Sequence, residues 1–392
     1  MVKRFFQQKL FWGGFVGIIL AVFIFTFTFM GSTVNPTLKE MPLAVVVQDE
    51  GVAMHNGQEM NFGRILEDQL KKNDNASIDW TFLDSREEAV KGLNEKEYYA
   101  AIVIPDDLSQ SIFSLLSEKP MQPEVEIFIN EGMNMTGATM ADQMTSGVLS
   151  NFNQQVQQNL YAQIAKTQAT LSVEQSKVLA QPVQVTKETL NPAGSHTANG
   201  NVSALFTQIL WITTFISSMI LYTAIKKLGQ GKWNFSAIFS QLLGGLLFVV
   251  SICGLVFWLT EGVLEVAIPN GGEMFMLLLF TGLMFFFIQG ALLNWIGYAA
   301  APLFILLLFF AIPVLTLPPE LLPEITRDWL YSWIPFRFSA EAFKDVLFFG
   351  SNPLENGLGV LGYTGLAGLI IMLLAVFKPN RREVKQNSVV VE

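Results

Sequence analysis

Six long runs of apolar residues constrain this chain more than any other feature. None of them contains a charged side chain, and they cover residues 10–30, 204–225, 237–259, 274–296, 299–317 and 358–377. A helix needs about 20 apolar residues to cross a hydrocarbon core of roughly 30 Å. The composition agrees, because 51% hydrophobic and 15% charged residues are too apolar a mixture for a soluble protein of 392 residues. The sequence therefore predicts an α-helical polytopic membrane protein with six transmembrane helices.

The first run has two interpretations, a retained anchor and a cleaved signal peptide. Residues 10–30 are longer than the 7–15 apolar residues typical of a signal peptide, and residues 31–33 offer no clear cleavage site between small side chains. The retained anchor is favoured.

Basic residues near the ends of the runs predict the orientation. With six spans, three basic clusters fall on one side of the membrane: Lys3, Arg4 and Lys9; Lys226, Lys227 and Lys232; Lys378, Arg381, Arg382 and Lys385. Lysine and arginine mark the cytoplasmic side. We therefore expect a multi-pass cell-membrane protein with a cytoplasmic N-terminal segment (1–9), an extracytoplasmic segment (31–203), a five-helix bundle (204–377) and a cytoplasmic tail (378–392).

The extracytoplasmic segment is acidic, with 22 acidic and 11 basic residues over 31–203. An acidic surface argues against a nucleic-acid partner. The one cysteine of the chain, Cys253, lies inside the third run, so the outer segment folds without an intramolecular disulfide. A large exposed domain without disulfides is compatible with a Gram-positive source.

Strands and helices alternate over the first hundred residues of the outer segment. Apolar, β-branched runs predict four strands, at 42–47, 78–83, 98–105 and 124–130. Helical spacing predicts helices over 61–72 and 85–93, with Asn61 and Ser85 as their N-caps. This alternation is typical of a small α/β domain inserted between the first and second spans.

A polar, amide-rich stretch follows from about 133 to 188. Its thin apolar stripe of Leu149, Phe152, Val156 and Leu160 predicts an amphipathic helix. Two roles remain open for it, a helix packed on the sheet and a stalk that forms dimers or binds a partner.

The search for catalytic chemistry gives a negative result. The two histidines, His55 and His196, lie in polar loops without metal-ligand spacing, and no phosphate-binding glycine loop or nucleophile elbow occurs. Asp106 and Asp107 follow a strand, where they are either paired carboxylates or, more simply, a helix cap. We therefore expect no enzyme activity, no metal and no cofactor, and any ATP must be bound by another chain.

Residues 318–356 are too polar for a span but rich in large apolar side chains. They predict helices lying in the outer membrane interface, or a lid packed on the bundle. We expect Arg337 and Glu341 to share one helix face and to form an ion pair, unless both are simply solvated. Pro335, Arg337, Glu341 and Lys344 are the candidate residues of an outer gate.

Several segments resemble a known family in order along the chain. Four segments are similar to the outer domain of the YhgE/phage-infection-protein family: 42–51 (PLAVVVQDEG), 98–105 (YYAAIVIP), 108–109 (LS) and 129–134 (INEGMN). Gln48 and Leu108 depart from the pattern of that family. Residues 334–343 (IPFRFSAEAF) resemble the segment before the last span of ABC type-2 permeases. The resemblance implies a permease-like half-transporter that forms a homo- or heterodimer.

Two functions follow as hypotheses. The first is an ABC type-2-like permease subunit that exports an amphipathic or lipid-like compound, or a peptide, and is powered by a separate cytoplasmic ATPase. The second is a cell-surface receptor or secretion accessory protein that does not transport. For the first, the loop between the second and third spans is the expected ATPase contact, or else an ordinary membrane anchor: Lys226, Lys227, Lys232, Trp233 and Phe235.

Overall fold

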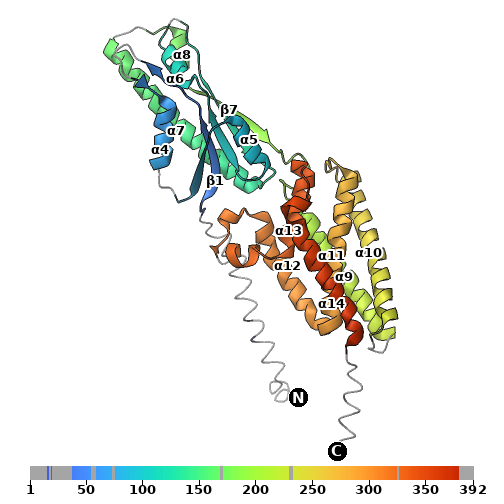
Figure 1. Cartoon of the computed structure of the whole chain (residues 1–392). Coiled ribbons are helices and arrows are strands. Elements are labelled where there is room, and N and C mark those ends of the chain that lie inside the picture. The colour runs from blue at the N-terminus through green and yellow to red at the C-terminus, as the bar shows by residue number, and fades with distance from the viewer. Residues whose placement is uncertain are drawn as a thin grey trace, which may run out of the picture. The chain divides into compact units, whose positions relative to one another are not determined.

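The computed structural model describes residues 38–53, 59–72, 76–117, 119–167, 171–228, 233–324 and 326–378, together with Val16 and Ile19. The chain divides into two compact units, Thr37–Ala193 and Gly194–Glu392, and Met1–Pro36 is grouped with the second (Figure 1). The predicted segment 1–9, nearly all of the first span 10–30, and the tail after Lys378 lie outside the described residues.

A five-stranded sheet forms the centre of the first unit (Figure 1). β1 is parallel to β4 and β5, β5 is antiparallel to β6, and β6 is parallel to β7. The four strands expected from the sequence are confirmed, and β7 is an addition. The strand order is β4 (Ile78–Leu83), β1 (Met41–Val47), β5 (Ala100–Ile104), β6 (Glu124–Asn130) and β7 (Gln184–Leu190). A separate small sheet pairs β2 (Val52–Ala53) with β3 (Glu59–Met60).

Helices cover both faces of the large sheet because successive strand residues point to opposite sides. Leu43 and Val45 of β1 face one core with α4 (Phe62–Lys72), α6 (Leu108–Ser114) and α7 (Met135–Thr167). Ala44 and Val46 face the other core with α5 (Arg86–Asn94). The predicted caps of α4 and α5 are confirmed, since Asn61 accepts from the Arg64 amide at 2.6 Å and Ser85 from the Glu88 amide at 3.2 Å.

The structure corrects the predicted helix over 133–188. α7 ends at Thr167, a second helix α8 (Val173–Ala180) begins with Ser172 as its cap, and β7 follows. Residues 184–190 become a strand because they pair with β6, a partner distant in sequence. The apolar stripe of α7, including Phe152 and Val156, is buried in the core under the sheet, so this stripe serves packing.

The second unit is helical. In the described part of the chain, four helical stretches are long and apolar enough to cross a membrane. They are α9 (Val202–Leu228), α10 (Phe235–Gly262), Gly271–Thr316 and Gly359–Phe377. The third stretch holds two predicted spans, α11 (Gly271–Ile296) and α12 (Ala300–Thr316), and the fourth contains α14 (Gly359–Leu374) and the turn η7 (Ala375–Phe377).

The stretch Gly271–Thr316 turns back on itself. A straight helix of 46 residues would be about 69 Å long, more than twice the hydrocarbon thickness. The helix breaks at η2 (Gly297–Ala299), where Gly297 has a φ of 70°. The Trp211 ring of α9 contacts both Phe285 of α11, at 5.0 Å between ring centres, and Phe304 of α12, at 5.8 Å. Both helices therefore pass the same part of α9.

α11 is the central helix of the bundle, and it contacts α9, α10 and α14. Glycines allow the close approach, as is common between membrane helices. A Cβ on Gly365 of α14 would lie 2.7 Å from the Cβ of Met284, and one on Gly368 would lie 2.9 Å from the backbone nitrogen of Ile288. The contact moves from Met284 to Ile288 along α11 as it moves from Gly365 to Gly368 along α14, so the two helices run parallel.

The predicted outer segment 318–356 forms α13 (Pro335–Lys344) and four short helical turns around it. Phe336 and Phe343 of α13 are fully buried against Trp211 and Phe206 of α9, with ring centres 4.6 and 5.3 Å apart. α13 is thus packed on the bundle, while the side chain of Trp329 is exposed. The turns are η3 (Pro319–Leu321), η4 (Thr326–Tyr331), η5 (Asp345–Phe349) and η6 (Leu354–Leu358).

Candidate functional site

Buried polar side chains run through the interior of the helical unit. The Gln289 amide of α11 donates to the Trp211 carbonyl at 3.0 Å, and the Trp211 indole donates to the Phe304 carbonyl at 3.1 Å. Gln241 of α10 and Asn294 of α11 exchange two amide hydrogen bonds of 3.1 and 2.8 Å. All four polar side chains have little or no exposed surface. We name this set, with Ser218 and Thr281, the polar seam.

Part of the polar seam is not satisfied by the protein. Among the atoms that the structure describes, the Gln289 side-chain carbonyl and the hydroxyls of Ser218 and Thr281 are buried without a hydrogen-bond partner. Burying a polar group without a partner costs about 1–3 kcal/mol. Such a cost in a membrane helix is typical of a functional position.

The predicted ATPase-contact residues lie where α9 ends and α10 begins, at one end of the bundle. Lys226 and Lys227 are exposed in the last turn of α9, and the Lys226 ammonium lies 4.7 Å from the centre of the Tyr298 ring. Trp233 stacks on Tyr222 at 5.7 Å between ring centres and is only partly exposed. Lys232 lies outside the described residues.

Phe235, the other predicted aromatic residue, behaves differently from Trp233. Its side chain is 75% exposed at the first position of α10, and Leu228 at the end of α9 is 86% exposed. The structure therefore separates the predicted pair into an anchored tryptophan and an open phenylalanine.

The predicted gate residues all lie on α13. Pro335 occupies its first position, and the Lys344 ammonium forms an ion pair with Glu341 at 3.0 Å. The Arg337 guanidinium lies 4.0 Å from the centre of the Tyr331 ring. Burial raises the pKa of the Tyr331 phenol well above its usual value. The pairing of Arg337 with Glu341 stays a prediction.

A buried carboxylate, Asp345, follows α13 directly and accepts the Ser351 hydroxyl at 2.9 Å. Sequence reasoning missed it. The signal was available, because Asp345 directly precedes the apolar run 346–349 and is the acidic residue next to it.

In the α/β unit, one carboxylate accepts hydrogen bonds from the first turns of two helices. Asp49, after the end of β1, accepts from the Gly63 amide of α4 at 2.8 Å, and from the Ser109 amide and hydroxyl of α6 at 2.9 and 2.6 Å. Asp107 was predicted to cap α6 and does not, since its side chain accepts the Ser111 hydroxyl instead. Helix N-termini attract anions, and here the anion is the chain's own Asp49.

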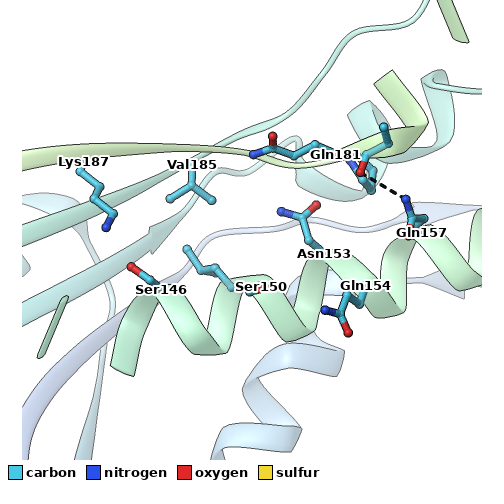
Figure 2. Close-up of a pocket in the computed structure, with 11 residues that line it drawn as sticks. Ser146, Ser150, Asn153, Gln154, Gln157, Gln181, Val185 and Lys187 are labelled. Carbon is cyan, nitrogen blue, oxygen red and sulfur yellow. Dashed lines mark hydrogen bonds between the residues drawn. The ribbon is translucent and has the colours of Figure 1, made fainter. Parts of the chain in front are cut away.

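A cavity of about 420 Å³ lies between α7 and β7, a volume within the range of ligand pockets (Figure 2). Hydroxyl and amide side chains dominate its lining, among them Ser150 and Gln154 of α7. The Gln157 amide donates to the carbonyls of Leu179 and Ala180 and so joins α7 to the end of α8. In the described residues, no cluster of three metal-ligating side chains occurs here or elsewhere.

Comparison with known proteins places the chain in a family. The family described as "Protein of unknown function (DUF3533)" matches residues 16–368, most of the chain. The chain belongs to this family.

Two further proteins are similar to this DUF3533 chain. "Uncharacterized protein YhgE" of Bacillus subtilis (strain 168) is 27% identical over 143 residues, which are 36% of this chain and 18% of that protein. The predicted resemblance to YhgE is thereby confirmed, although the match spans less than a fifth of its length. The second protein is a domain assigned to an ABC type-2 transporter of Thermotoga maritima MSB8, known from a crystal structure. It is 18% identical in sequence to this chain, the match covers 38% of this chain and 85% of that domain, and the TM-score is 0.27. So low a TM-score carries no argument about this DUF3533 chain.

The sequence also missed β7 and the cavity beside it. Pro182, between α8 and β7, was the available sign that the helical stretch ends before residue 184.

Proposed function

We propose that this chain is the permease subunit of an ABC type-2-like exporter, driven by a separate cytoplasmic ATPase. The cargo is an amphipathic or lipid-like compound, or a peptide. The resemblance of residues 334–343 to the segment before the last span of such permeases supports this proposal.

The polar seam is the observation that carries the proposal. The partnerless carbonyl of Gln289 and the hydroxyls of Ser218 and Thr281 cost free energy in the present arrangement. A second arrangement of α9 and α11, in which these groups meet cargo or water, would recover that free energy. A permease that alternates between two conformations needs a helix interface of this kind, because the two arrangements must be close in free energy.

The absence of charge in the apolar runs supports a lipid-like cargo over an ion. Ion-coupled carriers hold a proton or ion with an acidic or basic side chain inside the bilayer, whereas residues 204–225, 237–259, 274–296 and 358–377 have none.

In this proposal, both termini lie in the cytoplasm, residues 31–203 lie outside, the first span completes six, and two subunits form a dimer. The ATPase then contacts the end of the bundle where α9 meets α10. Phe235 and Leu228 are open there beside Lys226 and Lys227, which suits docking in a cleft on a soluble partner. Trp233 is held by Tyr222 and contributes less.

A co-purification assay tests the proposal. The full chain, isolated in mild detergent, should carry vanadate-sensitive ATP hydrolysis, and Phe235→Ala should abolish that hydrolysis without lowering expression. The matched control is Phe239→Ala, which removes a side chain 67% exposed one turn further along α10. Hydrolysis that is missing from the unmodified chain, or equal in the two variants, would contradict the proposal.

The receptor or accessory function remains the alternative. The polar cavity between α7 and β7 favours it. Deleting residues 35–200 distinguishes the two functions in a co-purification assay. An exporter would still co-purify with its ATPase, whereas a receptor would lose its protein partner.

A further inference from the structure

β7 is one of the two edge strands of the sheet, and its outer side has no strand partner among the described residues. β7 stands last in the strand order, and in the described part of the chain its ladder partner is β6. The N–H and C=O groups along its other side are therefore available to a further strand.

The hydrogen-bond register identifies those groups. The Gln184 amide donates to the Pro123 carbonyl at 2.9 Å, and the Leu190 carbonyl accepts from the Glu131 amide at 3.3 Å, so the backbones of both residues point toward β6. In a parallel ladder, alternate residues point to the same neighbour. The backbone groups of Val185, Lys187 and Thr189 consequently point outward.

The Asn153 side chain of α7 already bonds the backbone of Val183, the residue before β7 whose backbone groups also point outward. The Val183 N–H donates to the Asn153 side-chain oxygen at 2.8 Å, and the Asn153 side-chain amide donates to the Val183 carbonyl at 2.8 Å. The amide group of Asn153 thus makes the pair of bonds that a neighbouring strand would make. The two positions that follow, Val185 and Lys187, line the cavity beside α7 (Figure 2).

The chemistry of the cavity fits a polypeptide. α7 supplies Ser150 and Gln154 along its other side, and their hydroxyl and amide groups can bond polar side chains. The Lys187 ammonium is paired with Asp142 at 2.5 Å, so the groove has no excess charge that would select an ion.

We propose that the groove between α7 and β7 binds an extended polypeptide segment, which adds to the sheet as a strand beside β7. Main-chain hydrogen bonds to Val185 and Lys187 provide affinity, and the lining of α7 selects small polar side chains. This site is independent of the proposed transport function and would serve a receptor equally well. The alternative is an edge strand that Lys187 and Glu188 merely protect from aggregation.

The test uses the full chain in lipid nanodiscs and a displayed library of random twelve-residue peptides. We expect peptides to be enriched over empty nanodiscs. N-methylation of alternate amides in the best peptide should weaken binding about tenfold in one register and leave it unchanged in the other, because an added strand turns only every second amide toward β7.

Two adjacent substitutions on α7 provide the matched control. Ser150→Trp fills the groove and should reduce binding at least tenfold, whereas Asn151→Trp lies next to it on an exposed position outside the cavity lining and should have no effect. The proposal is overturned if no peptide is retained over empty nanodiscs, if both methylation registers act equally, or if Ser150→Trp binds as the unmodified chain does. None of these outcomes depends on an ATPase.

Discussion

Replacing Asp49 by alanine should destabilise the α/β unit more than any other single loss of a carboxylate described above. Asp49 is 8% exposed and accepts from the Gly63 amide, the Ser109 amide and the Ser109 hydroxyl. The Ser109 hydroxyl in turn accepts from the Phe62 amide at 2.8 Å. The substitution therefore removes the acceptor of the Ser109 amide at the start of α6 and the acceptor of the Gly63 amide in the first turn of α4, where the Asn61 cap remains.

The cost follows from these contacts. Each lost cap costs roughly 0.5–2 kcal/mol, and each buried amide left without a partner costs about 1–3 kcal/mol. Because these terms overlap, we expect a loss of about 3–5 kcal/mol, a large part of the about 5–15 kcal/mol that stabilises a typical domain.

Hydrogen exchange on the full chain in detergent measures this effect locally. In Asp49→Ala, amides of residues 61–72 and 108–116 should exchange at least 100-fold faster, since each 1.4 kcal/mol is a factor of about ten. The control is Asp107→Ala, whose carboxylate accepts the Ser111 hydroxyl at 2.8 Å and whose loss should change exchange less than fivefold. Equal effects of the two substitutions would refute the assignment of Asp49 as the shared cap.

Three further predictions concern the helical unit and the topology. Gln241→Leu should lower the stability of the bundle by about 1–2 kcal/mol in thermal unfolding, because it leaves the buried Asn294 amide without its partner. Adding Asn294→Leu should recover part of that loss, and additive losses from the two substitutions would contradict this. Gly365→Leu should prevent α14 from packing on Met284 and should be detected as loss of folded protein in size-exclusion chromatography, whereas Gly254→Leu, where a Cβ meets nothing within 4 Å, should be tolerated. A cysteine at Ser85 should react with a membrane-impermeant reagent on intact cells and one at Lys385 should not; reversed labelling would overturn the orientation argued from basic residues.

Elements with local signals were predicted well. The strand at Met41–Val47 and the helix at Arg86–Asn94 follow from alternation, from helical spacing and from the Ser85 cap, all of which depend on neighbours within a few residues. The apolar runs that became α9, α10, α11, α12 and α14 are equally local, since hydropathy is summed over one continuous segment.

Candidate site residues were predicted less completely, because their roles depend on distant partners. Trp233 and Phe235 look alike in the sequence, and only the presence of Tyr222 in the folded bundle anchors one and leaves the other open. Residues 318–356 form helices packed on the bundle, one of the two predicted alternatives, but the burial of α13 against Trp211 and Phe206 has no signal within residues 318–356.

The sequence by itself determined that this is a multi-pass membrane protein with an α/β region, because span length, strand alternation and helix caps are properties of short contiguous segments. The tertiary structure alone decided that residues 184–190 are a strand, that Asp49 rather than Asp107 caps α6, and that a polar groove lies beside β7. Each of these outcomes depends on a contact between segments tens of residues apart, and no pattern within either segment specifies its partner.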